Sequence, residues 1–232
     1  MRSGHEEHIQ LGRYLKDIVY SANDGIVTTF AVVAGVVGAN LSPTIILIIG
    51  FANLIADGFS MASGNYLGTK SEKEFYLREE SREKSEIKNM PAEERKEIRE
   101  VLIRKGYSGE DLEKITALIS TNEKFWVDFM MHEELGLFLP AMENPIKNAI
   151  ATFISFVLAG SVPLLPYLLS IPGNNFAWAI GTSAVTLFVV GAARKFFSSR
   201  SWIVSGLEML AVGGLAGAVA YFVGYILRII IG

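Results

Sequence analysis

Residues 44–69 read TIILIIGFANLIADGFSMASGNYLGT, a mostly apolar stretch that is long enough to cross a bilayer as one helix. Polar or sulfur-bearing side chains recur in it at every fourth position, at Asn53, Asp57, Met61 and Asn65. This spacing places them on one face of a helix. A carboxylate near the middle of a membrane helix costs about 2.5–3.5 kcal/mol on insertion scales, so we expect Asp57 to face protein, water or a bound cation.

Met61 indicates which class of cation this face would bind. Hard cations such as Ca²⁺ and Mg²⁺ prefer oxygen ligands alone, whereas a thioether beside carboxylate and amide oxygens suits a softer first-row transition metal. The pattern therefore points to iron or manganese. The alternative is that Met61 packs as an ordinary core methionine while Asp57 bonds a neighbouring helix, and this segment alone favours neither interpretation.

The whole chain has the composition of an integral membrane protein with a sizeable polar part. Half of its 232 residues are hydrophobic, and the lack of cysteine excludes disulfides and thiolate chemistry. Five stretches reach the length that a transmembrane helix needs, and they are Ile18–Ala39, Thr44–Thr69, Asn148–Ile171, Phe176–Ala193 and Trp202–Ile231. No phosphate-binding glycine loop, standard zinc motif or nucleophile elbow occurs, and we expect neither enzymatic activity nor a nucleic-acid partner.

The positions of lysine and arginine predict the orientation of these helices, because cytoplasmic loops retain basic residues. Basic residues precede the first span, follow the second, precede the third and separate the fourth from the fifth. The connections Asn40–Pro43 and Pro172–Asn175 carry no charge. All four basic places fall on one side of a five-span protein, so the N-terminus is expected in the cytoplasm.

A polar insert, residues 70–147, follows the second span and contains most of the charged residues of the chain. Proline and glycine divide it into four expected helices, Glu72–Lys88, Ala92–Lys105, Gly109–Ser120 and Glu123–Leu135. Apolar residues recur in them at helical spacing, which predicts a folded helical domain. In the third span, Pro163 and Pro166 predict a kink.

Glutamates in this insert suggest a metal site. Two pairs, each with members three residues apart, flank Pro91, so a turn there would bring four carboxylates together as in carboxylate metal sites of helical bundles. The candidate ligands of the insert are Glu83, Glu86, Glu94, Glu97, Met130 and Glu134. The alternative, and the commoner meaning of such a pattern, is a solvated helix surface with ion pairs four residues apart.

A second carboxylate lies within the membrane segments. Asp24 begins the run DGIVTT about two turns into the first span, and its short side chain reaches the interface poorly. The candidate residues of a transmembrane path are Asp24, Asn53, Asp57 and Met61.

Taken in order, several stretches resemble the vacuolar iron transporter family. They are Asp24–Thr29 (DGIVTT), Asp57–Gly68 (DGFSMASGNYLG), the glutamate-rich insert, Phe129–Gly136 (FMMHEELG) and Val162–Pro166 (VPLLP). The resemblance extends from about Leu15 to Ile231. It implies a five-span homodimer that exports cytosolic Fe²⁺, and often Mn²⁺, in exchange for protons, with a cytoplasmic domain that binds metal through Glu and Met.

The resemblance also assigns residues. The aspartate of span one corresponds to Asp24 and the methionine of span two to Met61, while the insert glutamates, Met130 and Glu134 correspond to the metal ligands of the cytoplasmic domain. Plant members have a glutamate where this chain has Asn53, so Asp57, one turn later, is the candidate replacement for that charge.

The expected protein is all-α and polytopic, with five transmembrane helices and a cytoplasmic metal-binding insert between the second and third. Its expected parts are residues 1–69, with an N-terminal segment and spans one and two, residues 70–147, the metal-binding domain, and residues 148–232, spans three to five. The leading functional interpretation is a proton-coupled Fe²⁺ exporter that also moves Mn²⁺, with Zn²⁺ and Co²⁺ as further candidate ions.

Other interpretations belong to different functional classes. The principal alternative is a membrane-anchored iron-binding sensor or storage protein without transport. A membrane ferroxidase is disfavoured, because no Glu-x-x-His pair of the di-iron type occurs within the expected helices. The expected partners are membrane lipids, divalent metal ions, protons and a second copy of the chain, in a prokaryotic cytoplasmic membrane or, in a eukaryote, the vacuolar membrane.

Overall fold

The computed structural model describes residues 3–138, 144–196 and 199–231, with side chains from residue 15 onward. These residues form helices joined by short connections, and no β-strand occurs among them, so the all-α prediction is confirmed. The chain divides into two compact units. The five-helix unit comprises Met1–Leu67 and Glu143–Gly232, and the insert unit comprises Gly68–Met142.

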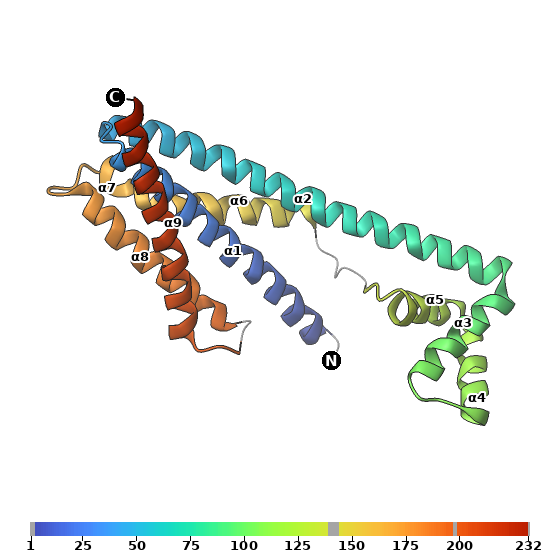
Figure 1. Ribbon diagram of the computed structural model, residues 1–232. Coiled ribbons are helices and arrows are strands. Elements are labelled where there is room, and N and C mark those ends of the chain that lie inside the picture. Colours follow the sequence, from blue (N-terminus) through green and yellow to red (C-terminus); the bar gives the residue numbers. More distant parts are fainter. Residues whose placement is uncertain (1–2, 139–143, 197–198, 232) are drawn as a thin grey trace. The chain divides into compact units, whose positions relative to one another are not determined.

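Among the described residues, five helical segments are long and apolar enough to span a membrane, which confirms the predicted number of spans. They belong to α1 (Ser3–Gly38), α2 (Pro43–Asn89), α6 (Pro145–Ser161) continued by α7 (Leu165–Leu168), α8 (Asn175–Ala193) and α9 (Trp202–Ile231), as Figure 1 shows. Within α1, the apolar segment begins at Leu15.

One predicted helix start is wrong, because α2 continues unbroken from the second span into the insert as a helix of 47 residues. The separate helix expected to begin at Glu72 is part of α2. No proline interrupts this stretch, Gly68 keeps helical geometry with open space around it, and Lys70 pairs with Glu74 one turn later at 3.7 Å. A helix of this length extends about 70 Å, more than twice the hydrocarbon core, so only its apolar N-terminal half can span a membrane.

The predicted kink in the third span is present. After α6 ends at Ser161, the chain forms a 3₁₀ turn, Val162–Leu164, before α7 begins at Leu165. Pro163 and Pro166 lie in the first turns of these two elements, where their missing N–H groups cost least.

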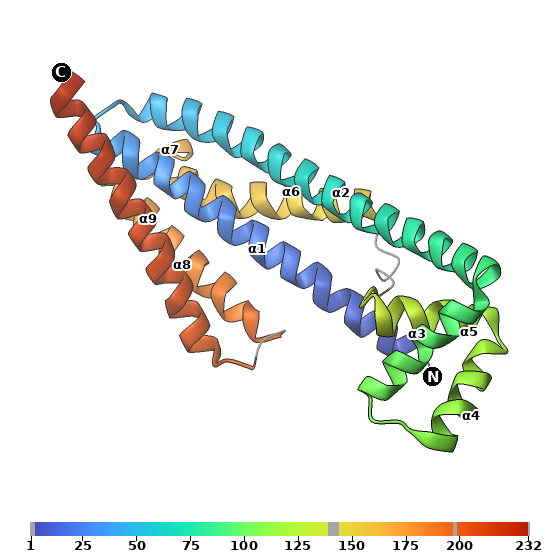
Figure 2. The ribbon, with the colours of Figure 1, turned by 45° about the vertical axis from the view of Figure 1, so that its right-hand side comes forward.

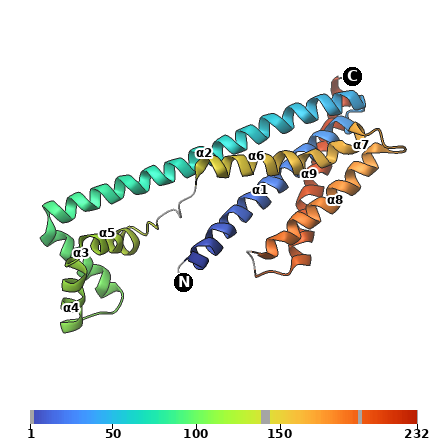
Figure 3. The ribbon, with the colours of Figure 1, turned by 180° about the vertical axis from the view of Figure 1, so that it is seen from behind.

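Helix α1 is the central element of the five-helix unit, since it contacts α6, α8 and α9. Helices α8 and α9 also lie side by side (Figure 3). A buried apolar core joins side chains of α1, α2, the third span and α8, namely Val33, Val36, Ile46, Leu54, Phe156, Leu164, Tyr167 and Ala179. The polar face of α2 is therefore held beside α1 and α6 by apolar packing.

The insert unit consists of the C-terminal part of α2, α3 (Pro91–Arg104), α4 (Gly109–Ser120), α5 (Glu123–Phe129) and a π-helical turn, Met130–Glu134 (Figure 2). The sequence predicted one α-helix over Glu123–Leu135, and the π turn corrects this. The unit has its own buried core, formed by Tyr76, Ile87, Ile98, Leu102, Leu112, Ile119, Trp126, Val127, Met130 and Met131. It is an ordered domain with an apolar interior, as its helical periodicity predicted.

Glycines allow α1 and α9 to cross at backbone contact. A Cβ at Gly224 would overlap the carbonyl oxygen of Gly35, and one at Gly38 would overlap the carbonyl oxygen of Tyr221. Neither obstacle is a flexible side chain, so the crossing requires small residues, as close helix packing in membranes often does. Earlier in α9, Gly214 has open space around its Cβ position.

Gly224→Ala is therefore expected to destabilise the protein by about 1–3 kcal/mol, because the added methyl group overpacks the crossing. The matched control is Gly214→Ala on the same helix, which should be neutral or stabilising by up to about 1 kcal/mol, since alanine loses less backbone entropy than glycine on folding. Thermal unfolding in detergent compares the two variants. Equal unfolding temperatures would contradict the close crossing.

Candidate metal-binding sites

The insert unit brings together three of the predicted glutamates. Glu83 and Glu86 belong to α2 and Glu94 to α3, and one carboxylate oxygen of each lies within 4.8 Å of the others. The reversal of the chain after Asn89, with Pro91 in the first turn of α3, produces this meeting. Such oxygens can share one divalent cation.

Two of these carboxylates are buried without hydrogen-bond partners. Glu83 is 5% exposed and Glu94 is 3% exposed, and the Oε2 atom of each has no partner among the described residues. The alternative of a solvated, ion-paired surface does apply to Glu86, which is half-buried and accepts a hydrogen bond from Arg82 at 3.0 Å. It does not apply to Glu83 and Glu94, because burying an unpaired carboxylate is costly unless a cation or a proton neutralises it.

The cluster faces a small cavity of about 170 Å³ in the insert unit. Its lining is strongly acidic, with the glutamates Glu79, Glu83, Glu86, Glu93, Glu94, Glu97 and Glu134 and the basic residue Arg82. The predicted ligands Glu97 and Glu134 thus lie at the same cavity as the three clustered glutamates. This local excess of negative charge favours a multivalent cation.

Met130 occupies a different place from the glutamates. Its side chain is fully buried in the apolar core of the insert unit together with Met131, and it is not among the residues that line the acidic cavity. The π turn is defined by the hydrogen bond from the Leu135 amide to the Met130 carbonyl at 3.1 Å. Because this turn alters the usual alignment of residues four apart, Glu134 reaches the cavity while Met130 packs inward.

Burial and mutual repulsion raise the pKa values of the carboxyl groups at this cavity. The pKa of Glu83 rises to about 7, first because of desolvation and then because of Glu134. The pKa of Glu94 rises to about 8, first because of desolvation and then because of Glu83. Desolvation and Glu97 also raise the pKa of Glu134, against a lowering by Arg104. Near neutral pH Glu83 and Glu94 therefore exchange protons readily, and a bound cation would displace their protons.

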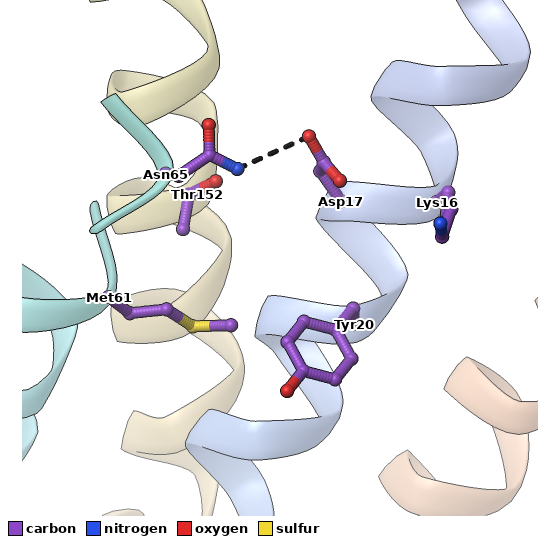
Figure 4. Close-up of a pocket in the computed structure, with 6 residues that line it drawn as sticks. All are labelled: Lys16, Asp17, Tyr20, Met61, Asn65 and Thr152. Carbon is purple, nitrogen blue, oxygen red and sulfur yellow. Dashed lines mark hydrogen bonds between the residues drawn. The ribbon is translucent and has the colours of Figure 1, made fainter. Parts of the chain in front are cut away.

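The five-helix unit contains a second candidate site, a cavity of about 430 Å³ between α1, α2 and α6 (Figure 4). Its lining residues are Lys16, Asp17 and Tyr20 of α1, Met61 and Asn65 of α2, and Thr152 of α6. The Asn65 side chain donates a hydrogen bond from Nδ2 to Asp17 Oδ2 at 3.2 Å. The predicted ligand Met61 thus shares a cavity with a carboxylate, an amide and a hydroxyl group.

Asp17 was not among the predicted members of this site. Its position, seven residues before Asp24, places both aspartates on one face of α1, and that spacing was the signal available. The carboxylate became recognisable only when α1 and α2 were seen together.

The remaining predicted residues of the path lie deeper along the same helices. Asn53 donates from Nδ2 to Asp57 Oδ2 at 2.7 Å, so this amide supports the aspartate one turn later. The carboxylates of Asp24 and Asp57 are near enough to repel each other. Both carboxylates are half-buried in apolar surroundings. A cation between them would reduce their mutual repulsion.

Comparison with known proteins gives consistent matches. The sequence profile of the VIT family matches residues 15–225. The vacuolar iron transporter of Plasmodium berghei is 34% identical, covering 97% of this chain and 86% of the relative. That of Toxoplasma gondii is 37% identical (94% and 76%), and vacuolar iron transporter 1 of Arabidopsis thaliana is 36% identical (93% and 87%). These matches confirm the resemblance, and the relatives are named as transporters rather than enzymes.

In metal-free protein, replacing Glu83 and Glu94 together with Gln is expected to raise the unfolding temperature by several degrees, with a gain that grows from about pH 5 to about pH 9. Both pKa values lie above the ordinary value of 4.5, so the folded state binds these protons more tightly than the unfolded chain. The resulting stability is complete below about pH 4.5 and is lost as pH rises through 7 to 8. Thermal unfolding across this pH range measures the difference.

The matched control replaces Glu110 and Glu113, whose side chains are exposed and paired with Lys114 and Arg99. With Gln at both positions, the unfolding temperature should depend on pH as it does in wild type. A pH dependence of the Glu83/Glu94 variant that equals that of wild type would contradict the buried, proton-binding cluster.

Proposed function

This chain belongs to the VIT family, and from that premise we propose that it is a homodimeric membrane transporter that moves Fe²⁺, and also Mn²⁺, out of the cytosol in exchange for protons. The observation that carries the proposal is the polar face of α2 within an apolar span, where Asp57 and Met61 face the Asp24 and Asp17 side of α1. The relatives' names supply the identity of the ion, iron.

We place the insert unit in the cytoplasm as the domain that captures the metal. The basic residues that flank the spans support this orientation, with the N-terminus on the same side. The acidic cavity around Glu83 and Glu94 supports the capture role, because its buried carboxylates lack partners of their own. The membrane would be a prokaryotic cytoplasmic membrane, or the vacuolar membrane in a eukaryote.

Competition between metal and protons provides a physical basis for the exchange. A carboxylate must lose its proton before it binds a metal ion, so each captured cation releases protons from groups with pKa values near neutrality. Along the path, the ion would pass the cavity at Asp17 and Met61 and then the pair Asp24 and Asp57. Asp57, supported by Asn53, is the candidate replacement for the glutamate that the family resemblance implies for plant members at position 53.

The second candidate function is iron sensing or storage without transport. The observation that favours it is that the insert unit has a complete core and an acidic cavity of its own, so metal binding there does not require the membrane helices. Transport and binding assays on the same protein separate the two functions.

We expect a fourfold Gln variant to bind Mn²⁺ at least about tenfold more weakly, because amides cannot neutralise a divalent cation. The four replaced residues are Glu83, Glu86, Glu94 and Glu97. Transport should become slower without ending, since the membrane path remains. Calorimetry with anaerobic protein measures the binding, and Gln at Glu110 and Glu113 is the control. Wild-type binding in the fourfold variant would place these glutamates on a solvated surface.

Asp24→Asn and Asp57→Asn should each fold and insert, yet reduce Fe²⁺ flux at least about tenfold, because the path loses a charge that stabilises the passing cation. Flux is measured in proteoliposomes with an imposed pH gradient. The control is Glu208→Gln, since Glu208 is exposed, pairs with Arg194 at 3.1 Å and does not line the cavity of Asp17 and Met61.

The outcomes have distinct meanings. Wild-type flux in both aspartate variants would show that the polar face of α2 serves only helix packing. Metal binding without any movement of Fe²⁺ in the unaltered protein would favour the sensing or storage function.

A further inference from the structure

The hydroxyl group of Thr152 is a buried polar group that has no hydrogen-bond partner among the described residues. Thr152 lies on α6, and only 1% of its surface is exposed. It is nevertheless one of the residues that line the 430 Å³ cavity with Asp17 and Met61. In Figure 4 its oxygen lies on the side of α6 that faces α1, near the bond between Asn65 and Asp17.

This hydroxyl group differs from those of four other helical threonines. Buried Thr29 of α1 also has no partner among the described residues, but it does not line this cavity. A threonine in a helix commonly donates its hydroxyl proton to the carbonyl three or four residues earlier. Thr28, Thr116, Thr182 and Thr186 all do so, to carbonyl oxygens at 2.7–2.9 Å. Leaving a buried hydroxyl unpaired is costly, so a partner within the cavity would stabilise Thr152.

The cavity is suited to a cation as that partner. It presents the Asp17 carboxylate, the Met61 thioether and the Asn65 side chain, which are donors of the kinds that a first-row transition metal accepts, and its lining includes one basic residue, Lys16. A hydroxyl oxygen adds a neutral donor from a third helix, either to the ion or to a water molecule of its hydration shell. Because a hydroxyl does not titrate near neutral pH, it can add affinity for the cation without adding a proton to the exchange.

We propose that Thr152 contacts the transported cation, directly or through one water molecule, and thereby sets the affinity of the cavity beside Asp17 and Met61. This proposal rests on the proposed transport function and extends the path from two helices to three. The competing explanation is that Thr152 only fills space between α2 and α6, in which case its hydroxyl group would have no effect on the ion.

Two substitutions separate these explanations in Fe²⁺ flux assays. Thr152→Val keeps the shape and removes the hydroxyl group, and it should raise KM for Fe²⁺ about three- to tenfold while kcat changes less than about twofold, because ground-state binding is what is lost. Thr152→Ser restores the hydroxyl group and should restore KM. The control is Ser183→Ala, since Ser183 on α8 is equally buried and also lacks a partner, yet does not line the cavity.

A third substitution tests proximity to the ion without transport. The chain contains no cysteine, so Thr152→Cys introduces a single thiol. Beside Asp17 and Met61 this thiol should bind Cd²⁺ as the thiolate, with an ultraviolet absorption band from the sulfur-to-metal bond that the unaltered protein cannot show. A stoichiometric band supports the proposal, and its absence overturns it.

The KM values also test whether Thr152 contacts the cation. An unchanged KM in Thr152→Val, or a raised KM that Thr152→Ser does not restore, would overturn the role of Thr152 while the proposed transport function stands. If the unaltered protein moves no Fe²⁺, the transport function fails, and the Cd²⁺ band at Thr152→Cys still determines whether the cavity holds a cation.

Discussion

Both units depend on the same constraint, which is that they contain carboxylates removed from water and left without a basic partner. Glu83 and Glu94 satisfy this description in the insert unit, and Asp24 and Asp57 approach it in the apolar spans. Each such group must be neutralised by a proton or a cation. The fold keeps these groups in place through apolar cores that are complete without them, so the candidate sites can change charge while the helices stay packed.

The five-helix unit shows how a polar path is retained among apolar helices. Small residues let α1 and α9 cross at backbone contact, which leaves the opposite faces of α1 to meet α2 and α6. On those faces the polar side chains bond one another, as Asn53 does with Asp57 and Asn65 with Asp17. Such bonds hold the oxygen atoms in position without supplying a compensating positive charge, which a passing divalent ion would provide.

In the insert unit, the π turn separates residues that pack in the core from a residue that faces the acidic cavity. The π turn at Met130–Glu134 directs two methionines into the core while Glu134 faces the acidic cavity. A regular α-helix would have kept Met130 and Glu134 on one face. Proton affinity near neutrality then follows from burial and from the crowding of carboxylates, because each raises the free energy of the charged form.

The sequence by itself determined the features that depend on local pattern. Apolar length identified five spans, helical periodicity identified the folded insert, and the glutamates on either side of Pro91 identified the cluster, because a chain reversal at that proline brings the pairs together. It could not determine that α2 continues through Gly68, since a single glycine costs a helix only about 1 kcal/mol and the flanking helices compensate for it. Tertiary structure alone placed Asp17 and Thr152 beside Met61 and buried Met130 away from the glutamates. The physical reason is that these positions depend on how helices distant in sequence meet and on how one turn widens, and no spacing within a single helix encodes either.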